Sequence, residues 1–233
     1  MPQTCFDIDE ADTQSSQIVQ KLSNTSTRII NHEESKFSYG YRLETAAKLL
    51  FMIVQWMRDI IPFQNLLEND RRVLLEEAWT QLFLVHLAQW SKSWNLIEIL
   101  EDEQVCKRLQ DSAFYHELIT IKRILHLFKE LSPDESECGC MKAVVLFTPD
   151  LANLLAVETI EMIHSQAFYS FYDYTISRHS HVKFLGLIRL LFLLNHVNSK
   201  AIELLFFCDT IGQIPISHLL SNMYNTDQKL YCN

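Results

Sequence analysis

Two closely spaced pairs of metal-binding side chains are the first candidates for chemistry in this chain. They are His179-x-His181 and Cys138-x-Cys140. Imidazole and thiolate are common zinc ligands, but a tetrahedral site needs four ligands and usually draws them from separate parts of the fold. Each pair is too short in sequence to define a site alone, and a distant pair would have to complete it. We therefore expect no metal site.

The acidic clusters give no stronger indication of catalysis. Glu76-Glu77 and the Glu-Asp-Glu run at 101–103 resemble helix-terminal and solvated charge more than a carboxylate pair for acid–base work. The sequence contains no Gly-rich phosphate loop, no nucleophile elbow and no H-E-x-x-H pattern. These observations favour a protein that is not an enzyme and that needs no cofactor.

Length and composition indicate one domain with a large core. The chain has 233 residues, of which 48% are hydrophobic, with only four glycines and five prolines. Its formal charge of −9 leaves no basic face for phosphate contacts, so we expect no direct nucleic-acid contact by this segment. Proteins or small apolar molecules are the expected partners.

The cysteines and the apolar runs bear on the cellular compartment. Six cysteines occur without the density of a secreted disulfide scaffold, which fits reduced thiols inside the cell. No apolar run follows Met1, and Arg58, Arg189 or Asn195 interrupts the longest apolar runs. We therefore expect neither a signal peptide nor a membrane span.

The elements that position these residues are expected to be helices. Apolar residues recur at helical spacing, and no strand alternation competes with that pattern. The segments 41–60 and 70–91 are apolar nearly all round, which predicts that both helices are buried. The expected helices span 41–60, 70–91, 104–131, 136–147, 151–178, 182–208 and 215–224. Together they predict an all-α, multilayer domain.

Residues 1–40 differ from the rest in composition. They are acidic and polar, with few large apolar side chains to bury, which predicts a flexible, hinge-like leader. Ile18, Val19 and Leu22 share a face and allow a weak short helix. The expected organisation is therefore a leader over 1–40 and a helical domain over 41–233.

Several segments, in order along the chain, resemble the ligand-binding domain of nuclear receptors. They are 44–90, 137–150, 184–194, 202–207 and 210–224. Residues 137–150 are similar to the helix 7 to helix 8 region of the retinoid X receptor branch. The terminal Thr-Ile-Gly-x-Ile-Pro-Ile-x-x-Leu-Leu-x-x-Met-Tyr is similar to the tailless and photoreceptor-specific receptors. The resemblance implies a multilayer helical sandwich in a nuclear protein that regulates transcription.

In this family, helices 3, 4 and 12 form a groove that holds a short coregulator helix. The resemblance places the basic clamp of that groove at Arg58 and the acidic clamp at Asn222, which carries no charge. Arg71 and Arg72 make the groove basic, so an orphan receptor that binds a corepressor helix is expected. Alternatively, the arginines are solvated and Asn222 is a tolerated surface change. The matching groove residues are Val54, Arg58, Arg71, Arg72, Leu75, Glu76, Leu219, Leu220, Asn222 and Met223.

The terminal helix itself resembles a coregulator motif. Leu219, Leu220 and Met223 form an i, i+1, i+4 apolar set. We therefore expect that these residues can occupy the groove of their own domain when no partner is bound.

The expected ligand pocket lacks an anchor for an acid. The resemblance places Trp90 where retinoid-type receptors have an arginine, and an indole cannot pair with a carboxylate. A small-molecule ligand is therefore doubtful, and several large apolar side chains are assigned to the core. The alternatives are a receptor activated by a small lipophilic molecule or haem, and a haem or metal protein on an unrelated helical fold. The residues assigned to the core are Phe51, Met52, Met57, Trp79, Phe83 and Phe147.

The segment 184–194 is apolar on every side except for Gly186 and Arg189. The resemblance implies that this helix, the family's helix 10, packs against a second copy or a related chain about a two-fold axis. The alternative is a helix that lies wholly in the interior. Phe192 stands where the retinoid X receptor branch has proline. The expected dimer interface consists of Phe184, Leu187, Ile188, Leu191 and Leu194.

Overall fold

The computed structural model describes residues 39–90, 115–207 and 214–231, which form helices joined by turns and short loops. No residue in these ranges belongs to a β-strand, and the predicted all-α fold is confirmed. The helices are α2 (Tyr39–Arg58), α3 (Ile61–Gln64), α4 (Glu68–Trp90), α7 (Tyr115–Leu131), α8 (Glu135–Leu146), α9 (Val157–Arg178), α10 (His181–Leu194), α11 (Ser199–Phe206) and α12 (Ile216–Tyr231).

Two predictions from sequence fall largely on other residues. The leader predicted over 1–40, with its short helix near Ile18, lies outside the described residues except for its last two positions, where α2 begins. The part of the helix predicted over 104–131 that precedes Tyr115 also lies outside them. Within the described residues, no helix is both long enough and apolar enough to cross a membrane.

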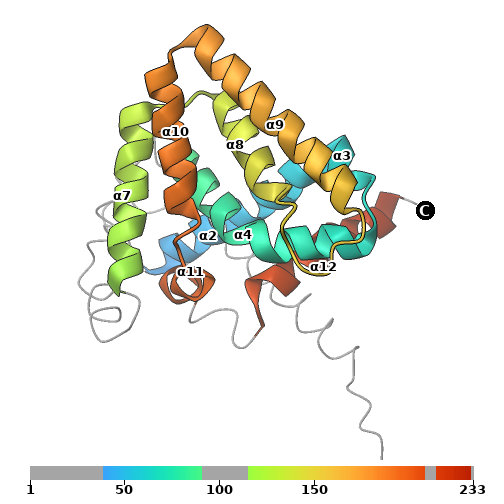
Figure 1. The fold of residues 1–233 in the computed structure, drawn as a ribbon. Helices are drawn as coiled ribbons and strands as arrows, with labels where there is room; N and C mark the ends of the chain where they lie inside the picture. The colour runs from blue at the N-terminus through green and yellow to red at the C-terminus, as the bar shows by residue number, and fades with distance from the viewer. Residues whose placement is uncertain (1–38, 91–114, 208–213, 232–233) are drawn as a thin grey trace, which may run out of the picture.

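The helix α4 lies at the centre of the domain. It contacts α2, α7, α8 and α12, and every residue from Leu82 to Ala88 is buried. The helix α9 lies along α8, and α10 contacts both α7 and α9. Figure 1 shows α9 and α10 meeting at the top of the view, with α12 near α4 at the bottom. The burial predicted for the 70–91 helix follows from this central position.

The short helix α3 was not predicted, since the helices expected from sequence end at residue 60 and resume at residue 70. Proline is compatible with the first turn of a helix, where its missing N–H needs no partner. Pro62 occupies such a position, and Phe63 is buried beside it. This single turn connects the end of α2 to α4 and places Phe63 in the core.

The helix α9 begins later than its predicted start at residue 151. The buried carboxylate of Asp70 accepts hydrogen bonds from the backbone N–H groups of Leu155 (2.8 Å) and Ala156 (3.0 Å). Asn153 has a φ of 70°, in the left-handed region where a helix cannot continue. Asp70 on α4 therefore fixes the backbone immediately before the first residue of α9.

The single helix predicted over 182–208 is two helices, so that prediction was wrong. The helix α10 ends at Leu194, and the side chain of Asn198 accepts a hydrogen bond from the backbone N–H of Lys200 at 2.9 Å. This bond caps α11 and satisfies one of its free N-terminal donors. The polar residues at 195, 196 and 198 mark this break in the sequence, but the prediction extended a single helix across them.

Candidate functional site

The terminal helix α12 lies against α2 and α4, the helices that match the predicted groove. Leu219 and Leu220 are fully buried, and Met223 and Tyr224 are 6% and 3% exposed. The apolar set recognised in the sequence is therefore the inward face of this helix. Because α12 contacts both helices, the predicted groove residues of α2, α4 and α12 lie in one region of the domain.

Arg58, the last residue of α2, links that helix to α12. Its guanidinium Nη2 donates a hydrogen bond to the backbone carbonyl of Met223 at 2.7 Å. The side-chain amide of Gln64 donates to the carbonyl of Arg58, which ties α3 to the same position. A guanidinium is suited to such a carbonyl contact because it is always charged and has several donors. The residue predicted as the basic clamp contacts the protein's own helix.

Arg71 holds the same helix through an aromatic ring. Its guanidinium carbon lies 5.6 Å from the centre of the Tyr224 ring, and its Nη1 donates to the carbonyl of Gln64 at 2.9 Å. Phe63 contacts the same ring edge to face, with 5.5 Å between centroids. Burial raises the pKa of the Tyr224 hydroxyl, and the nearby positive charges of Arg71 and Arg58 oppose that rise. Tyr224 is thus fixed between α3 and α4.

Arg72 is used differently from Arg71. It is exposed, forms an ion pair with Glu76 at 3.0 Å one turn along α4, and donates to the Asn69 side chain at 3.4 Å. Such an exposed pair stabilises a helix by only about 0.3–0.5 kcal/mol, but it offsets the positive charge that the sequence suggested for this region.

Little open space remains between α4 and α12. Val54 and Leu75, the apolar groove residues predicted on α2 and α4, are each 2% exposed. The cavity between α4 and α12 has a volume of about 40 Å³, enough for one or two water molecules. Asn222 is half-buried. The cavity is lined by Glu68, Arg71, Arg72, Leu75, Ser221 and Asn225.

The residues predicted for the dimer interface lie mostly on the inner side of α10. Phe184, Leu187, Leu191 and Leu194 are at most 8% exposed, and Ile188 is half-buried. The helix packs against α7 and α9, so these side chains belong to the core of the same chain. A dimer interface formed by these five residues remains a prediction, because one chain alone does not test it.

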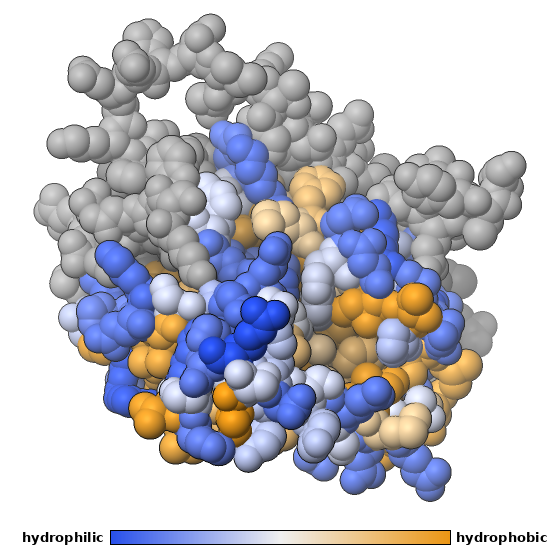
Figure 2. All heavy atoms as spheres, turned by 90° about the horizontal axis from the view of Figure 1, so that it is seen from above, coloured by the Kyte–Doolittle hydropathy of each residue, from blue (hydrophilic) through white to orange (hydrophobic). Residues whose placement is uncertain are grey.

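The opposite side of α10 carries exposed apolar side chains. Val182, Leu185 and Phe192 are 79%, 66% and 63% exposed and follow helical spacing. The helix is therefore not wholly interior, which was the alternative interpretation. Figure 2 shows apolar side chains gathered in separate patches among polar ones on the face seen from above.

The assignment of large apolar residues to the core was right for four and wrong for two. Met57, Trp79, Phe83 and Phe147 are at most 3% exposed, whereas Phe51 and Met52 are 38% and 45% exposed. The apolar character of 41–60 on all sides did not distinguish its inner from its outer face.

Aromatic rings and a neutral imidazole fill the interior near α4. The Phe83 ring contacts those of Phe206 and Phe207 edge to face, with centroids 5.2 and 5.7 Å apart. Burial, together with the nearby charge of Lys142, lowers the pKa of His86 to about 4, although a hydrogen bond to the Leu82 carbonyl opposes this shift. His86 is therefore neutral at pH 7.

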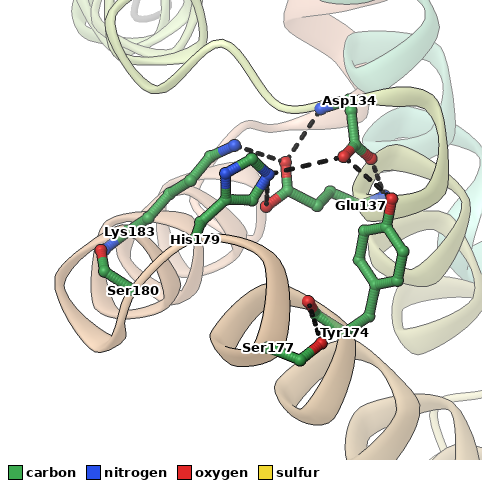
Figure 3. A network of polar contacts seen from close by, with 7 residues as sticks. All are labelled: Asp134, Glu137, Tyr174, Ser177, His179, Ser180 and Lys183. Carbon is green, nitrogen blue, oxygen red and sulfur yellow. Dashed lines mark hydrogen bonds and ion pairs between the residues drawn. The ribbon is translucent and has the colours of Figure 1, made fainter.

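The two metal-ligand pairs recognised in the sequence do not form one site. His179 lies near Asp134 and Glu137, whereas the ring of His181 faces Tyr172. Cys138 is buried and Cys140 is half-buried. Figure 3 shows the polar network around His179, whose acidic members were not predicted from the sequence. Only the ligand spacing of His179 pointed to this region, because its partners are distant in the chain.

Comparison with known proteins gives one consistent family. A family model described as the ligand-binding domain of nuclear hormone receptor matches residues 31–211. Protein tailless of Drosophila virilis is 29% identical over 216 residues, which cover 78% of this chain and 48% of that protein. Nuclear receptor subfamily 2 group F member 5 of Danio rerio is 30% identical over 186 residues, which cover 77% of this chain and 46% of that protein. The chain spans about half the length of these relatives.

The solved structures agree on the fold. The Ultraspiracle ligand binding domain from Drosophila melanogaster is similar with a TM-score of 0.62 at 18% identity, and the match covers 91% of this chain and 97% of that one. At this identity the match shows the fold alone, and it confirms the predicted helical sandwich. The match to Protein tailless confirms the subgroup resemblance drawn from residues 210–224.

Proposed function

This chain belongs to the family of nuclear hormone receptor ligand-binding domains, and from that premise we propose that it regulates transcription in the nucleus as an orphan, repressor-type domain. Its α12 occupies the groove between α2 and α4 when no partner is present. A leucine-rich corepressor helix then binds in that groove by displacing α12. The function rests on helix-in-groove binding and involves no reaction chemistry.

The hydrogen bond from Arg58 to the Met223 carbonyl is the observation that carries this proposal. A bound coregulator helix needs the basic clamp for its own carbonyls, and here α12 uses it. Leu219, Leu220 and Met223 bury their side chains as the leucines of a coregulator helix would. A coactivator must therefore compete with a helix that is covalently attached and present at high effective concentration.

The uncharged Asn222 supports repression over activation. In the family's active arrangement an acidic residue of the last helix faces the N-terminal N–H groups of the coactivator helix, where negative charge is favourable. Asn222 supplies no charge at that end. The dense ring packing of Phe83, Phe206 and Phe207 further favours control by partners over control by a large acidic ligand.

The first prediction concerns removal of α12. A chain that ends at Pro215 should bind a fluorescent corepressor peptide more tightly than the full chain, at least about threefold, because the competing helix is gone. Fluorescence anisotropy titration measures both affinities, and circular dichroism checks that the helices persist.

A full-length variant guards against misfolding of the truncated chain. Leu219→Ala with Leu220→Ala weakens the docking of α12 while every backbone hydrogen bond stays available, so it should also tighten peptide binding. A peptide with its leucines replaced by alanine serves as the control. Equal or weaker affinity of both variants for the corepressor peptide contradicts self-occupancy.

A further inference from the structure

Three side chains with metal-binding atoms converge where the corner between α9 and α10 meets the start of α8. Asp134 is the N-cap residue of α8, Glu137 lies in its first turn, and His179 directly follows α9. His179 Nε2 is 3.6 Å from Asp134 Oδ2 and 3.7 Å from Glu137 Oε1. The ligand atoms of all three lie within 4.8 Å of one another, and Figure 3 shows them facing a common point.

Hydrogen bonds and an ion pair hold both carboxylates in place and leave Asp134 Oδ2 and Glu137 Oε1 directed at His179. Asp134 and Glu137 form a capping box, in which Asp134 Oδ1 accepts from the Glu137 N–H at 2.8 Å and Glu137 Oε2 accepts from the Asp134 N–H at 2.9 Å. Lys183 Nζ contacts the same Oε2 at 2.7 Å, and the Tyr174 hydroxyl donates to Asp134 Oδ2 at 3.1 Å. The positions of the carboxylate groups are thus set by their own helix and by the helices around them.

The second oxygen of Glu137 is the unexplained atom of this network. Glu137 is fully buried, and its Oε1 has no hydrogen-bond partner. His179 Nε2 lies 3.7 Å from this oxygen, which is too distant for a hydrogen bond. A buried carboxylate oxygen without a partner is costly, so a site that retains one calls for a specific explanation. Lys183 neutralises one of the two carboxylates, which leaves a net negative charge facing the imidazole.

We propose that Asp134 Oδ2, Glu137 Oε1 and His179 Nε2 bind a divalent transition-metal ion of the zinc type. Zinc bonds of about 2.0–2.2 Å in a tetrahedron place ligand atoms about 3.3–3.5 Å apart, and the two distances to His179 exceed this by only a few tenths of an ångström. The ion satisfies Glu137 Oε1 and leaves a fourth position for water. The Tyr174 hydroxyl and Lys183 act as outer contacts that orient the carboxylates.

The three ligand atoms determine which metal ions this site should prefer. One imidazole nitrogen with two carboxylate oxygens suits zinc and its neighbours, whereas Mg²⁺ and Ca²⁺ prefer six or more oxygen ligands. A bound ion would join the corner that carries His179 to the first turn of α8. It would thereby stabilise the contact of α8 with α9 and α10, at a distance from the groove occupied by α12.

The test uses the full chain, stripped with a chelator, and calorimetric titration with Zn²⁺. His179→Gln removes the exposed ligand without disturbing the capping box, and His181→Gln, an exposed histidine of the same corner, is its matched control. We expect wild type and His181→Gln to bind one more equivalent of Zn²⁺ than His179→Gln, and Zn²⁺ to raise the Tm of those two chains only. Equal stoichiometry and equal Tm shifts in all three chains would overturn the proposal.

The absorption spectrum of bound Co²⁺ distinguishes an ion at this site from an ion bound by the cysteines. Co²⁺ bound by nitrogen and oxygen gives ligand-field absorption without the intense thiolate charge-transfer band. We expect the spectrum of the Co²⁺-loaded chain to lack that band and to disappear in His179→Gln. A thiolate band that disappears in Cys140→Ser and persists in His179→Gln would overturn the assignment. Displacement of Zn²⁺ by equimolar Mg²⁺ would also overturn it, because only an unspecific acidic cluster behaves in that way.

Discussion

Arg58 and Asn222 give the α12 contact a charge at one end only. Arg58 is a guanidinium bonded to the Met223 carbonyl, whereas Asn222 contributes no negative charge. We predict that Asn222→Glu improves binding of a coactivator L-x-x-L-L peptide by about 0.5–1.5 kcal/mol, because the new carboxylate can face the peptide's N-terminal amides. The gain stays modest, because the site is partly solvated and Arg71 and Arg72 compete for the carboxylate.

Arg58, the basic residue at the other end of the predicted groove, provides the control for this prediction. Arg58→Ala should abolish the gain, and titrations of wild type, both single variants and the double variant measure the coupling. Tight binding of the coactivator peptide to wild type, with no change in Asn222→Glu, would reclassify the domain as an ordinary activator.

His86 makes the stability of the fold sensitive to acid. Its pKa falls from 6.5 to about 4 on folding, because burial and the charge of Lys142 disfavour the imidazolium. The unfolded chain therefore binds the proton first, so the contribution is complete above pH 6.5 and is lost as the pH falls toward 4. We predict a loss of about 2 kcal/mol in the free energy of unfolding between pH 7.5 and pH 5 from this residue.

Urea unfolding of wild type and His86→Phe at the two pH values measures this contribution. The phenyl ring keeps much of the volume and the edge-to-face contact with Trp56 but cannot take up a proton. The variant should lose about 2 kcal/mol less than wild type on acidification, whatever its own stability at pH 7.5. An identical loss in both chains rules out His86 as the source.

The two faces of α10 have different roles. The inner face, with Leu187 fully buried, packs in the core, whereas Leu185 on the outer face is 66% exposed. The helix also approaches α7 closely at Gly186, where an added Cβ would lie 2.5 Å from Leu131 Cδ2. These contacts hold the inner face of α10 in the core of its own chain, whereas the outer apolar face is exposed.

We therefore predict opposite outcomes for charges on the two faces. Leu187→Glu should destabilise the domain by about 3 kcal/mol or more, because it buries an unpaired carboxylate. Leu185→Glu should leave the Tm within a few degrees of wild type and weaken self-association. Thermal unfolding and sedimentation measure the two effects. Retained stability in Leu187→Glu, or unchanged self-association in Leu185→Glu, would place the interface elsewhere.

Helix boundaries followed from sequence only where the signal was local. The capping box of Asp134 and Glu137 is readable in the sequence, and α8 begins within one residue of its prediction. The start of α9 depends on Asp70, a residue of another helix, so no local pattern could reveal it. The break between α10 and α11 falls in the mostly polar stretch 195–200, where Asn198 is a readable N-cap residue, but the prediction extended one helix across it.

The architecture was predictable because helical burial leaves a strong periodic signal, while the family resemblance supplied the arrangement of the helices. The groove was predicted through that resemblance and remains a prediction, although Arg58 does contact the backbone carbonyl of Met223. The inner face of α10 could not be chosen from sequence, since both faces are apolar. The cluster of Asp134, Glu137 and His179 was missed because it forms only when the α9–α10 corner folds back onto α8.

The proposed function requires that α12 and the corepressor helix exclude each other from the groove, and a competition titration measures this exclusion. A chain that ends at Ile214 is loaded with a fluorescent corepressor peptide, and an unlabelled peptide spanning 215–231 is added. We expect complete displacement of the label, and a weaker effect when the added peptide carries Leu219→Ala and Leu220→Ala. Binding of the 215–231 peptide without loss of the corepressor peptide would show two separate sites and contradict binding in a shared groove.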